Sequence, residues 1–212
     1  NGAPRYAVSR NGTQIMPAAF LGMRFQSQAA FDDGFRVAGT STATRDETWE
    51  QPWSESRFVR NHYNELRVRL TEKLKLKRSF DVVFRVYDDG IGFRYEFPDQ
   101  PQLKDVVIDD ELTEFDVAPP ATAWWIPAGE WNRYEYLYNR TPLVEVGQVH
   151  TPMTIRTADG LHMAFHEAAL VDYSSMWLRR VEGQRFRAQL APAAGGWKVR
   201  RTAPFHTPWR TL

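Results

Sequence analysis

Apolar and polar residues alternate along most of this chain, which is the pattern of β-strands that turn one face toward a core. The clearest case is a hairpin that rises through residues 80–86, turns at Asp88-Asp89-Gly90 and returns through residues 91–97. Its apolar positions are Phe80, Val82, Phe84, Val86, Ile91, Phe93, Tyr95 and Phe97. The same alternation marks residues 66–70 and 176–180. After a turn, residues 186–190 are predicted to form the second strand of a hairpin with residues 176–180.

Turn-forming dipeptides separate these runs, as they do between the strands of hairpins. They are Asn11-Gly12, Asp33-Gly34, Asp89-Gly90, Asp159-Gly160 and Glu182-Gly183. No segment keeps apolar residues at helical spacing with caps at both ends, so we expect little helix. Many strands in one domain of this size predict an all-β fold, a large sandwich or a barrel, over residues 1–212.

One carboxylate continues an apolar face. Apolar residues alternate over 161–165 after the turn at Asp159-Gly160, and Glu167 has the same parity. A carboxylate on a partly dry face has to be protonated, paired with a cation or bound to a metal, because an unpaired buried charge is costly. No Arg or Lys stands beside it in sequence. The open alternatives are backbone N–H groups, a distant arginine such as Arg156 or Arg210, or a metal ion.

Other carboxylate and histidine groups carry weaker signals. Asp109-Asp110-Glu111 fits turn or surface chemistry. His162 and His166 have the spacing of a helical zinc pair, but on a strand they would stand about 13 Å apart, too far to share one ion. We therefore interpret both histidines as residues on the solvent side of a strand.

Trp124 and Trp125 follow two prolines and precede Ile126-Pro127. Successive residues of a strand point to opposite faces. One of the two tryptophans is therefore predicted to join the core, and the other is free to stack on a sugar ring or to pack against a second domain.

Composition excludes several classes of function. The 212 residues carry 27 Lys and Arg against 26 Asp and Glu, so the net charge of +1 gives no field for nucleic acid. No apolar run approaches the roughly 20 residues of a membrane helix, and no signal peptide is evident. Cysteine is absent, as are serine-hydrolase, phosphate-loop and zinc-protease motifs. The missing initiator Met and the aromatic-rich end lead us to expect a piece of a longer protein.

Eight short stretches, in order, together resemble the N-terminal domain of glycoside hydrolase family 97, a bacterial family of α-glucosidases and α-galactosidases. They are Phe20-Leu21-Gly22, Glu47-Thr48-Trp49, Asn61-His62-Tyr63-Asn64-Glu65-Leu66, residues 84–95 (FRVYDDGIGFRY), Ala123-Trp124-Trp125-Ile126-Pro127, Thr151-Pro152, residues 167–173 (EAALVDY) and Thr207-Pro208-Trp209-Arg210. The resemblance spans nearly the whole chain.

The resemblance implies a β-supersandwich of the galactose-mutarotase-like kind, followed by a catalytic (β/α)8 barrel and a small C-terminal β domain that this chain lacks. The catalytic carboxylates would lie on the barrel, so no catalytic residue is expected here and the chain alone should be inactive. Family members are exo-acting on α-linked oligosaccharides and bind calcium beside the sugar. One calcium ligand comes from the N-terminal domain, and the matching position is Glu167.

The resemblance also implies lesser roles for other residues. Asn64, Glu65 and Arg210 match family motifs and are expected to bind substrate or to line a domain interface, as are Trp124 and Trp125. His166 is expected to bind substrate or to line the interface as well, although it stands where a smaller polar residue is expected before the glutamate. The family implies the bacterial periplasm or the extracellular space. In the isolated chain we expect Glu167 to be exposed at a vacant interface, with calcium bound weakly or not at all.

Two other functions remain open from the residues alone. One is a free-standing carbohydrate-binding β-sandwich with Trp124 or Trp125 as a stacking platform. The other is a mutarotase-like epimerase that uses His166 and Glu167 as acid and base.

Overall fold

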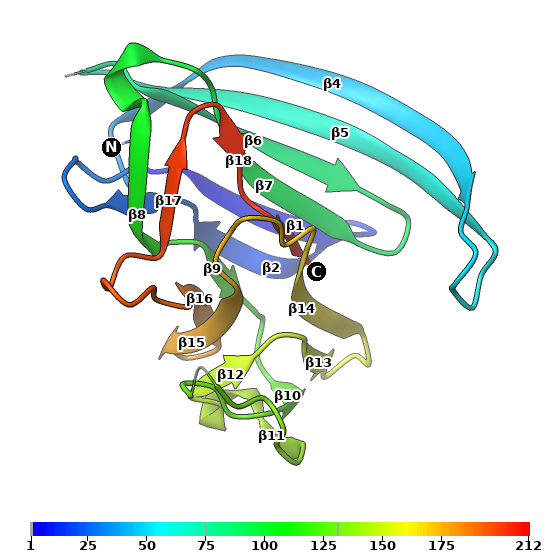
Figure 1. The fold of residues 1–212 in the computed structure, drawn as a ribbon. Coiled ribbons are helices and arrows are strands. Elements are labelled where there is room, and N and C mark those ends of the chain that lie inside the picture. Colours follow the sequence, from blue (N-terminus) through cyan, green and yellow to red (C-terminus); the bar gives the residue numbers. More distant parts are fainter. Residues whose placement is uncertain (1, 75, 131) are drawn as a thin grey trace.

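The computed structural model describes residues 2–74, 76–130 and 132–212 and consists of two layers of antiparallel β-strands with the core between them (Figure 1). Its described part contains two short 3-10 helices, η1 (Pro101–Leu103) and η2 (Leu143–Glu145), and no α-helix. No helix in these ranges has the length and apolarity needed to cross a membrane. The all-β sandwich predicted from the alternating pattern is confirmed.

One layer is a ten-stranded sheet. Its order is β11 (Asn139–Pro142), β10 (Ala121–Trp125), β13 (Met153–Thr157), β14 (His162–Ala168), β19 (Trp209–Thr211), β7 (Ile91–Phe97), β6 (Ser79–Val86), β5 (Phe58–Glu72) and β4 (Phe35–Glu50), with β18 (Phe205–His206) also paired to β7. The two longest strands, β4 and β5, arch along one edge of the molecule in Figure 1.

The second layer consists of three smaller sheets. The first has the order β12 (Gln148–His150), β15 (Met176–Glu182), β16 (Arg185–Leu190) and β9 (Glu114–Asp116). The second has the order β17 (Val199–Thr202), β8 (Asp105–Glu111) and β3 (Met23–Phe25), and the third pairs β1 (Arg5–Arg10) with β2 (Thr13–Phe20).

Aromatic side chains join the two layers. Tyr6 of β1 packs on Phe93 of β7 with ring centroids 4.8 Å apart, and Phe115 of β9 packs on Phe165 of β14 at 4.9 Å. All four rings are buried. Burial of such side chains at about 25 cal/mol per Å² of apolar surface is the main term that holds the layers together.

The strands predicted from alternation form as expected. In the β6–β7 hairpin Val82 lies opposite Tyr95 and Phe84 opposite Phe93, and the turn closes through the Tyr87 N–H to the Gly90 carbonyl. In the β15–β16 hairpin Met176 lies opposite Leu190. Only the tip of the first hairpin departs from the prediction, because Val86 is 49% exposed.

Candidate functional site

Glu167 and Arg210 lie opposite each other in the antiparallel pair of β14 and β19. In β14 every second residue is buried, so Met163, Phe165 and Glu167 all point between the two layers. The Arg210 Nη1 donates to Glu167 Oε2 at 2.8 Å, and the Met176 N–H donates to Glu167 Oε1 at 2.8 Å. Both carboxylate oxygens of Glu167 therefore have a donor inside the domain.

A second carboxylate completes a buried ion cluster. Arg210 also donates from Nε to Glu111 Oε1 at 2.8 Å and from Nη2 to Glu111 Oε2 at 2.5 Å, and neither of these residues is exposed to solvent. This bidentate arrangement fixes the guanidinium plane. The Thr113 hydroxyl donates to Glu111 Oε1 at 2.8 Å, and the Tyr95 hydroxyl lies 2.6 Å from that of Thr113.

The cluster of Glu111, Arg210 and Glu167 has two carboxylates for one guanidinium. Burial raises the pKa of Glu167, and the negative charge of Glu111 raises it further, while Arg210 and the Met176 N–H lower it. The net effect is a raised pKa for the Glu167 carboxyl. A cation beside the cluster would therefore be stabilised electrostatically.

Tyr173 closes one side of this cluster. The Arg210 guanidinium carbon lies 5.8 Å from the centroid of the Tyr173 ring. The Tyr173 hydroxyl is buried and has no hydrogen-bond partner among the described residues. Its pKa is raised well above the ordinary value, first by burial and then by the charge of Glu111.

These contacts correct one expectation. Glu167 was expected to be exposed at a vacant interface, but it is only 9% exposed and is paired. Of the alternatives open from the sequence, Arg210 and a backbone N–H are the partners, whereas Arg156 is exposed and lies on the other face of the sheet. The expectation failed because the strand ends inside the sandwich, where β19 supplies the guanidinium.

Glu111 is the residue that the sequence did not reveal. Alternation places Val106 and Ile108 in the core, and its continuation would turn Glu111 outward. A register shift in the β3–β8 pair, between the partners of Arg24 and Phe25, reverses the parity and turns Glu111 inward. The alternation of hydrophobic residues does not by itself predict where such a bulge occurs. The prediction of turn or surface chemistry for Asp109-Asp110-Glu111 is wrong for Glu111.

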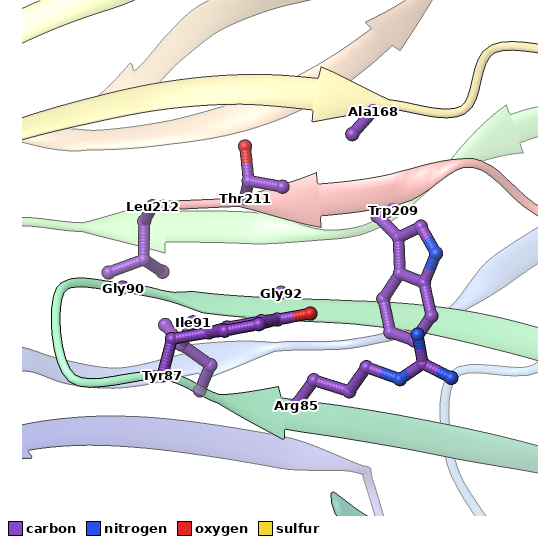
Figure 2. A pocket seen from close by; sticks show the side chains of 9 residues that line it. All are labelled: Arg85, Tyr87, Gly90, Ile91, Gly92, Ala168, Trp209, Thr211 and Leu212. Atoms are coloured by element: carbon purple, nitrogen blue, oxygen red, sulfur yellow. The ribbon is translucent and has the colours of Figure 1, made fainter. Parts of the chain in front are cut away.

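The opposite face of the same strands carries a hollow of about 230 Å³ (Figure 2). Ala168, Trp209 and Arg85 line it, and Figure 2 shows the Arg85 guanidinium beside the Trp209 indole. The Arg85 guanidinium carbon lies 4.5 Å from the Trp209 ring centroid and 4.3 Å from that of Tyr63. Glu65 holds Arg85 through a 2.9 Å bond to Nε.

The remaining predicted site residues do not all converge on Glu167. Asn64 is exposed and accepts a hydrogen bond from Thr44 at 2.8 Å, on the face opposite to Glu65. His166 is exposed, also on the face opposite to Glu167, and His162 is exposed too. The interpretation of the two histidines as solvent-side residues is confirmed.

The two tryptophans lie on β10, three strands from β19. Trp125 packs against the core, and its Nε1–H donates to Thr141 Oγ1 at 3.2 Å. Trp124 lies on the outer face, where the Arg140 guanidinium carbon is 5.3 Å from its ring centroid. The prediction of one core and one outward tryptophan is confirmed.

The described residues do not form a complete metal site, because they contain no group of three or more His, Asp or Glu side chains placed to hold one ion. Glu167 fits a contributing role, since each of its oxygens accepts one hydrogen bond and retains a free lone pair. Hard cations such as calcium take about six to eight oxygen ligands. The others would have to come from outside these residues.

Residues 1–212 match the family model described as "Glycosyl-hydrolase 97 N-terminal". A retaining alpha-galactosidase from Bacteroides thetaiotaomicron is 24% identical over 201 residues, which are 88% of this chain and 29% of that protein. A probable retaining alpha-galactosidase from Streptomyces bingchenggensis is 28% identical over 220 residues, covering 100% of this chain and 32% of that protein. The chain thus spans about a third of the length of these relatives.

Solved structures give the same comparison. A glycoside hydrolase family 97 enzyme from Pseudoalteromonas sp. strain K8, solved with panose and with acarbose, is 40% identical with a TM-score of 0.96. The match covers 100% of this chain and 32% of that one. A beta-arabinopyranosidase has a TM-score of 0.88 at 24% identity, which shows a shared fold only, over 99% of this chain and 36% of that one.

Proposed function

This chain belongs to the glycosyl-hydrolase 97 N-terminal family, and we propose that it is the non-catalytic N-terminal domain of an exo-acting α-glycosidase, an α-glucosidase or α-galactosidase. The domain packs on a (β/α)8 barrel that carries the catalytic carboxylates, and it supplies Glu167 to a calcium ion beside the sugar. The substrate of the whole enzyme is an α-linked oligosaccharide. The family resemblance further favours export to the periplasm or the cell exterior.

The observation that carries the proposal is the buried cluster of Glu111, Arg210 and Glu167. Arg210 is held by two bonds to Glu111 and by one bond to Glu167, so it orients the Glu167 carboxylate while neutralising only one of the two negative charges. Glu167 therefore retains both the charge and the lone pairs of a cation ligand.

Exposed apolar side chains next to Glu167 support a packing partner at this end of β14. Leu170 and Val171 follow the strand and are 45% and 71% exposed. Apolar surface of this kind, gathered beside a polar site, is typical of an interface.

Hydrogen bonds connect residues 132–138, where Leu137 and Tyr138 are 91% and 67% exposed, to the site. The Tyr134 hydroxyl donates to the Thr151 carbonyl at 2.6 Å, and the Thr151 hydroxyl donates to the Met176 carbonyl at 3.0 Å. The Met176 N–H in turn donates to Glu167. Contacts made by a partner domain with residues 132–138 would therefore reach the Glu167 carboxylate through only a few bonds.

Calcium, when bound, would supply positive charge that orients sugar hydroxyls or a water molecule. In the longer protein, Glu167→Gln should weaken calcium binding, measured by calorimetry with the ion itself, and should lower kcat. Glu50→Gln is the matched control, because Glu50 is an exposed carboxylate at the end of β4 that pairs with Arg57. Unchanged calcium affinity in Glu167→Gln would argue against the ligand role.

A second test concerns the chain alone. The 212-residue chain should not hydrolyse aryl α-glycosides, because the acid and base would lie on the barrel. Turnover at a rate typical of an enzyme would contradict the non-catalytic role. The epimerase alternative gains no support, since His166 and Glu167 point to opposite faces of β14 and cannot act on one sugar carbon.

A further inference from the structure

Strands β11, β10, β13 and β14 are neighbours in the large sheet and lie at one end of the molecule (Figure 1). Their outer face carries arginine and aromatic side chains. Trp124 lies opposite Arg140 on one side, and Thr122 lies opposite Arg156 on the other. The intervening positions Ala121, Ala123 and Ile155 are buried, so alternation turns the named side chains away from the core. The face therefore combines an indole with two guanidinium groups.

A hollow of about 330 Å³ lies on this face. Its lining includes Thr122, Trp124, Arg140, Arg156 and Thr157. Thr122 is small, so its position on β10 leaves a depression between the longer side chains of the adjacent strands. The Trp124 indole is half-buried and forms one wall.

The two arginines of this hollow lack carboxylate partners. Within the described ranges neither Arg140 nor Arg156 forms a salt bridge, whereas Arg85 and Arg94 on the same face of the sheet are both paired with glutamates. Asp159, in the turn after β13, accepts a hydrogen bond from the Thr157 hydroxyl. Two guanidinium groups beside one small hollow thus leave positive charge without a counter-ion among the residues that the structure describes.

We propose that this hollow binds a carboxylate-bearing pyranose, such as a hexuronate unit of a glycan. Arg140 and Arg156 donate N–H groups to the carboxylate, for which the planar guanidinium fork is suited. Trp124 packs against the apolar face of the sugar ring, and the Thr122 hydroxyl faces the ring hydroxyls. The site goes beyond the proposed function, because it lies on the outer face of the sheet while Glu167 points into the sandwich.

The ligand class follows from the three kinds of group in the hollow. A neutral sugar would use Trp124 but would leave both guanidinium groups without an anionic partner. A free carboxylate would use the arginines but not the indole. Of these three kinds of ligand, a sugar acid is the one that engages both arginines and the indole. The difference between its affinity and the affinities of the other two therefore measures the specificity of the site.

The test is titration of the 212-residue chain with glucuronate, glucose and acetate at constant ionic strength, followed by two-dimensional NMR. Glucuronate should bind about tenfold more tightly than either of the other two compounds, with shifts at Trp124 and Thr122. Acetate or glucose binding as tightly as glucuronate would overturn the proposal.

Variants assign the contacts. Arg156→Gln and Arg140→Gln should each weaken glucuronate binding by about fivefold or more, and Arg156→Lys should weaken it less because charge is kept while the fork is lost. Arg10→Gln is the matched control, an exposed arginine on β1. Trp124→Ala should lower the affinity for glucuronate to that for acetate, whereas affinity unchanged in Arg156→Gln or Trp124→Ala would overturn the site.

Discussion

The Arg210 Nη1 lies 2.8 Å from Glu167 Oε2 inside the sandwich, although 43 residues separate the two in sequence. Glu111 binds the same guanidinium from β8, in the opposite layer. One arginine therefore ties the two layers together through ionic hydrogen bonds. Since the site is dry, each partner depends on the others for its charge compensation.

Replacement of Arg210 should be strongly destabilising. In Arg210→Met the carboxylates of Glu111 and Glu167 remain buried without their cation, which typically costs about 3–5 kcal/mol. The free energy of unfolding, measured by urea titration, should recover in part when Glu111→Gln is added, because the uncompensated charge is then removed. Arg57→Met, which breaks an exposed pair with Glu50, is the control. Equal losses in both arginine variants would contradict the structural role.

Alternation was enough to predict the strands that bury one face. It identified the β6–β7 and β15–β16 hairpins and placed Glu167 on the inner face of β14, whose residues alternate strictly between exposed and buried. In β6 and β15 consecutive residues are buried as well, so Val83 and Trp177 are covered although they lie off the inward-facing parity. Alternation gave no signal for most of β4, whose residues are nearly all exposed. That strand is held by its pairing with β5 along its whole length rather than by burial.

The partners of Glu167 could not be predicted, for two physical reasons. The strand order β14-β19-β7 is a property of the folded sheet, and it alone brings Arg210 beside Glu167. The bulge between β3 and β8 reverses the parity at Glu111, and alternation assumes that parity is kept. Sequence thus revealed a carboxylate that needed a partner, while the packing of distant strands determined which partner it has.

Gly22 should not tolerate a side chain. A Cβ at this position would lie 2.3 Å from the backbone oxygen of Phe31, so the backbone would have to move. The Gly22 N–H also donates to the Tyr95 hydroxyl at 3.2 Å, and that bond would be strained. Gly22→Ala should lower the unfolding free energy by about 2–3 kcal/mol. A Cβ at Gly39 would have open space around it, so Gly39→Ala should change the free energy of unfolding by less than about 0.5 kcal/mol. Urea titration measures the free energy of unfolding of both variants.

Trp209 should contribute through its two arginine contacts. The guanidinium carbons of Arg85 and Arg94 each lie 4.5 Å from its ring centroid. Each cation–π contact is worth about 0.5–1 kcal/mol at a partly exposed site. Trp209→Leu should therefore lower the free energy of unfolding by about 1–2 kcal/mol more than Trp209→Phe does, as measured by thermal or urea unfolding. Trp197, with Arg200 at 4.9 Å, is the control and should show about half this difference. No difference between the Leu and Phe variants would mean that only the apolar area of Trp209 matters.

Asp81 should make the domain sensitive to acid. Arg69 donates to both of its oxygens, at 2.7 and 2.9 Å, and Arg67 donates at 3.0 Å. Burial acts to raise the pKa of Asp81, but the hydrogen bonds from Arg69 and Arg67 outweigh it and the pKa is lowered. The Asp81 carboxyl therefore binds a proton more readily in the unfolded chain than in the folded one. Its contribution to the free energy of unfolding is complete above the unfolded pKa of about 3.9. That contribution is lost as the pH falls through the lower pKa of the folded state. Asp81→Asn should lower the free energy of unfolding by about 2 kcal/mol at pH 7, and this difference should shrink as the pH falls below about 3.9 when urea midpoints are compared.

Asp46→Asn is the control. Its carboxylate is also bound by two nitrogens of one arginine, Arg60, but Asp46 lies on the exposed strand β4, where solvent screens the pair. This variant should change the urea midpoint far less at either pH, and a loss as large as that of Asp81→Asn would show that burial of Asp81 is not the source of its effect.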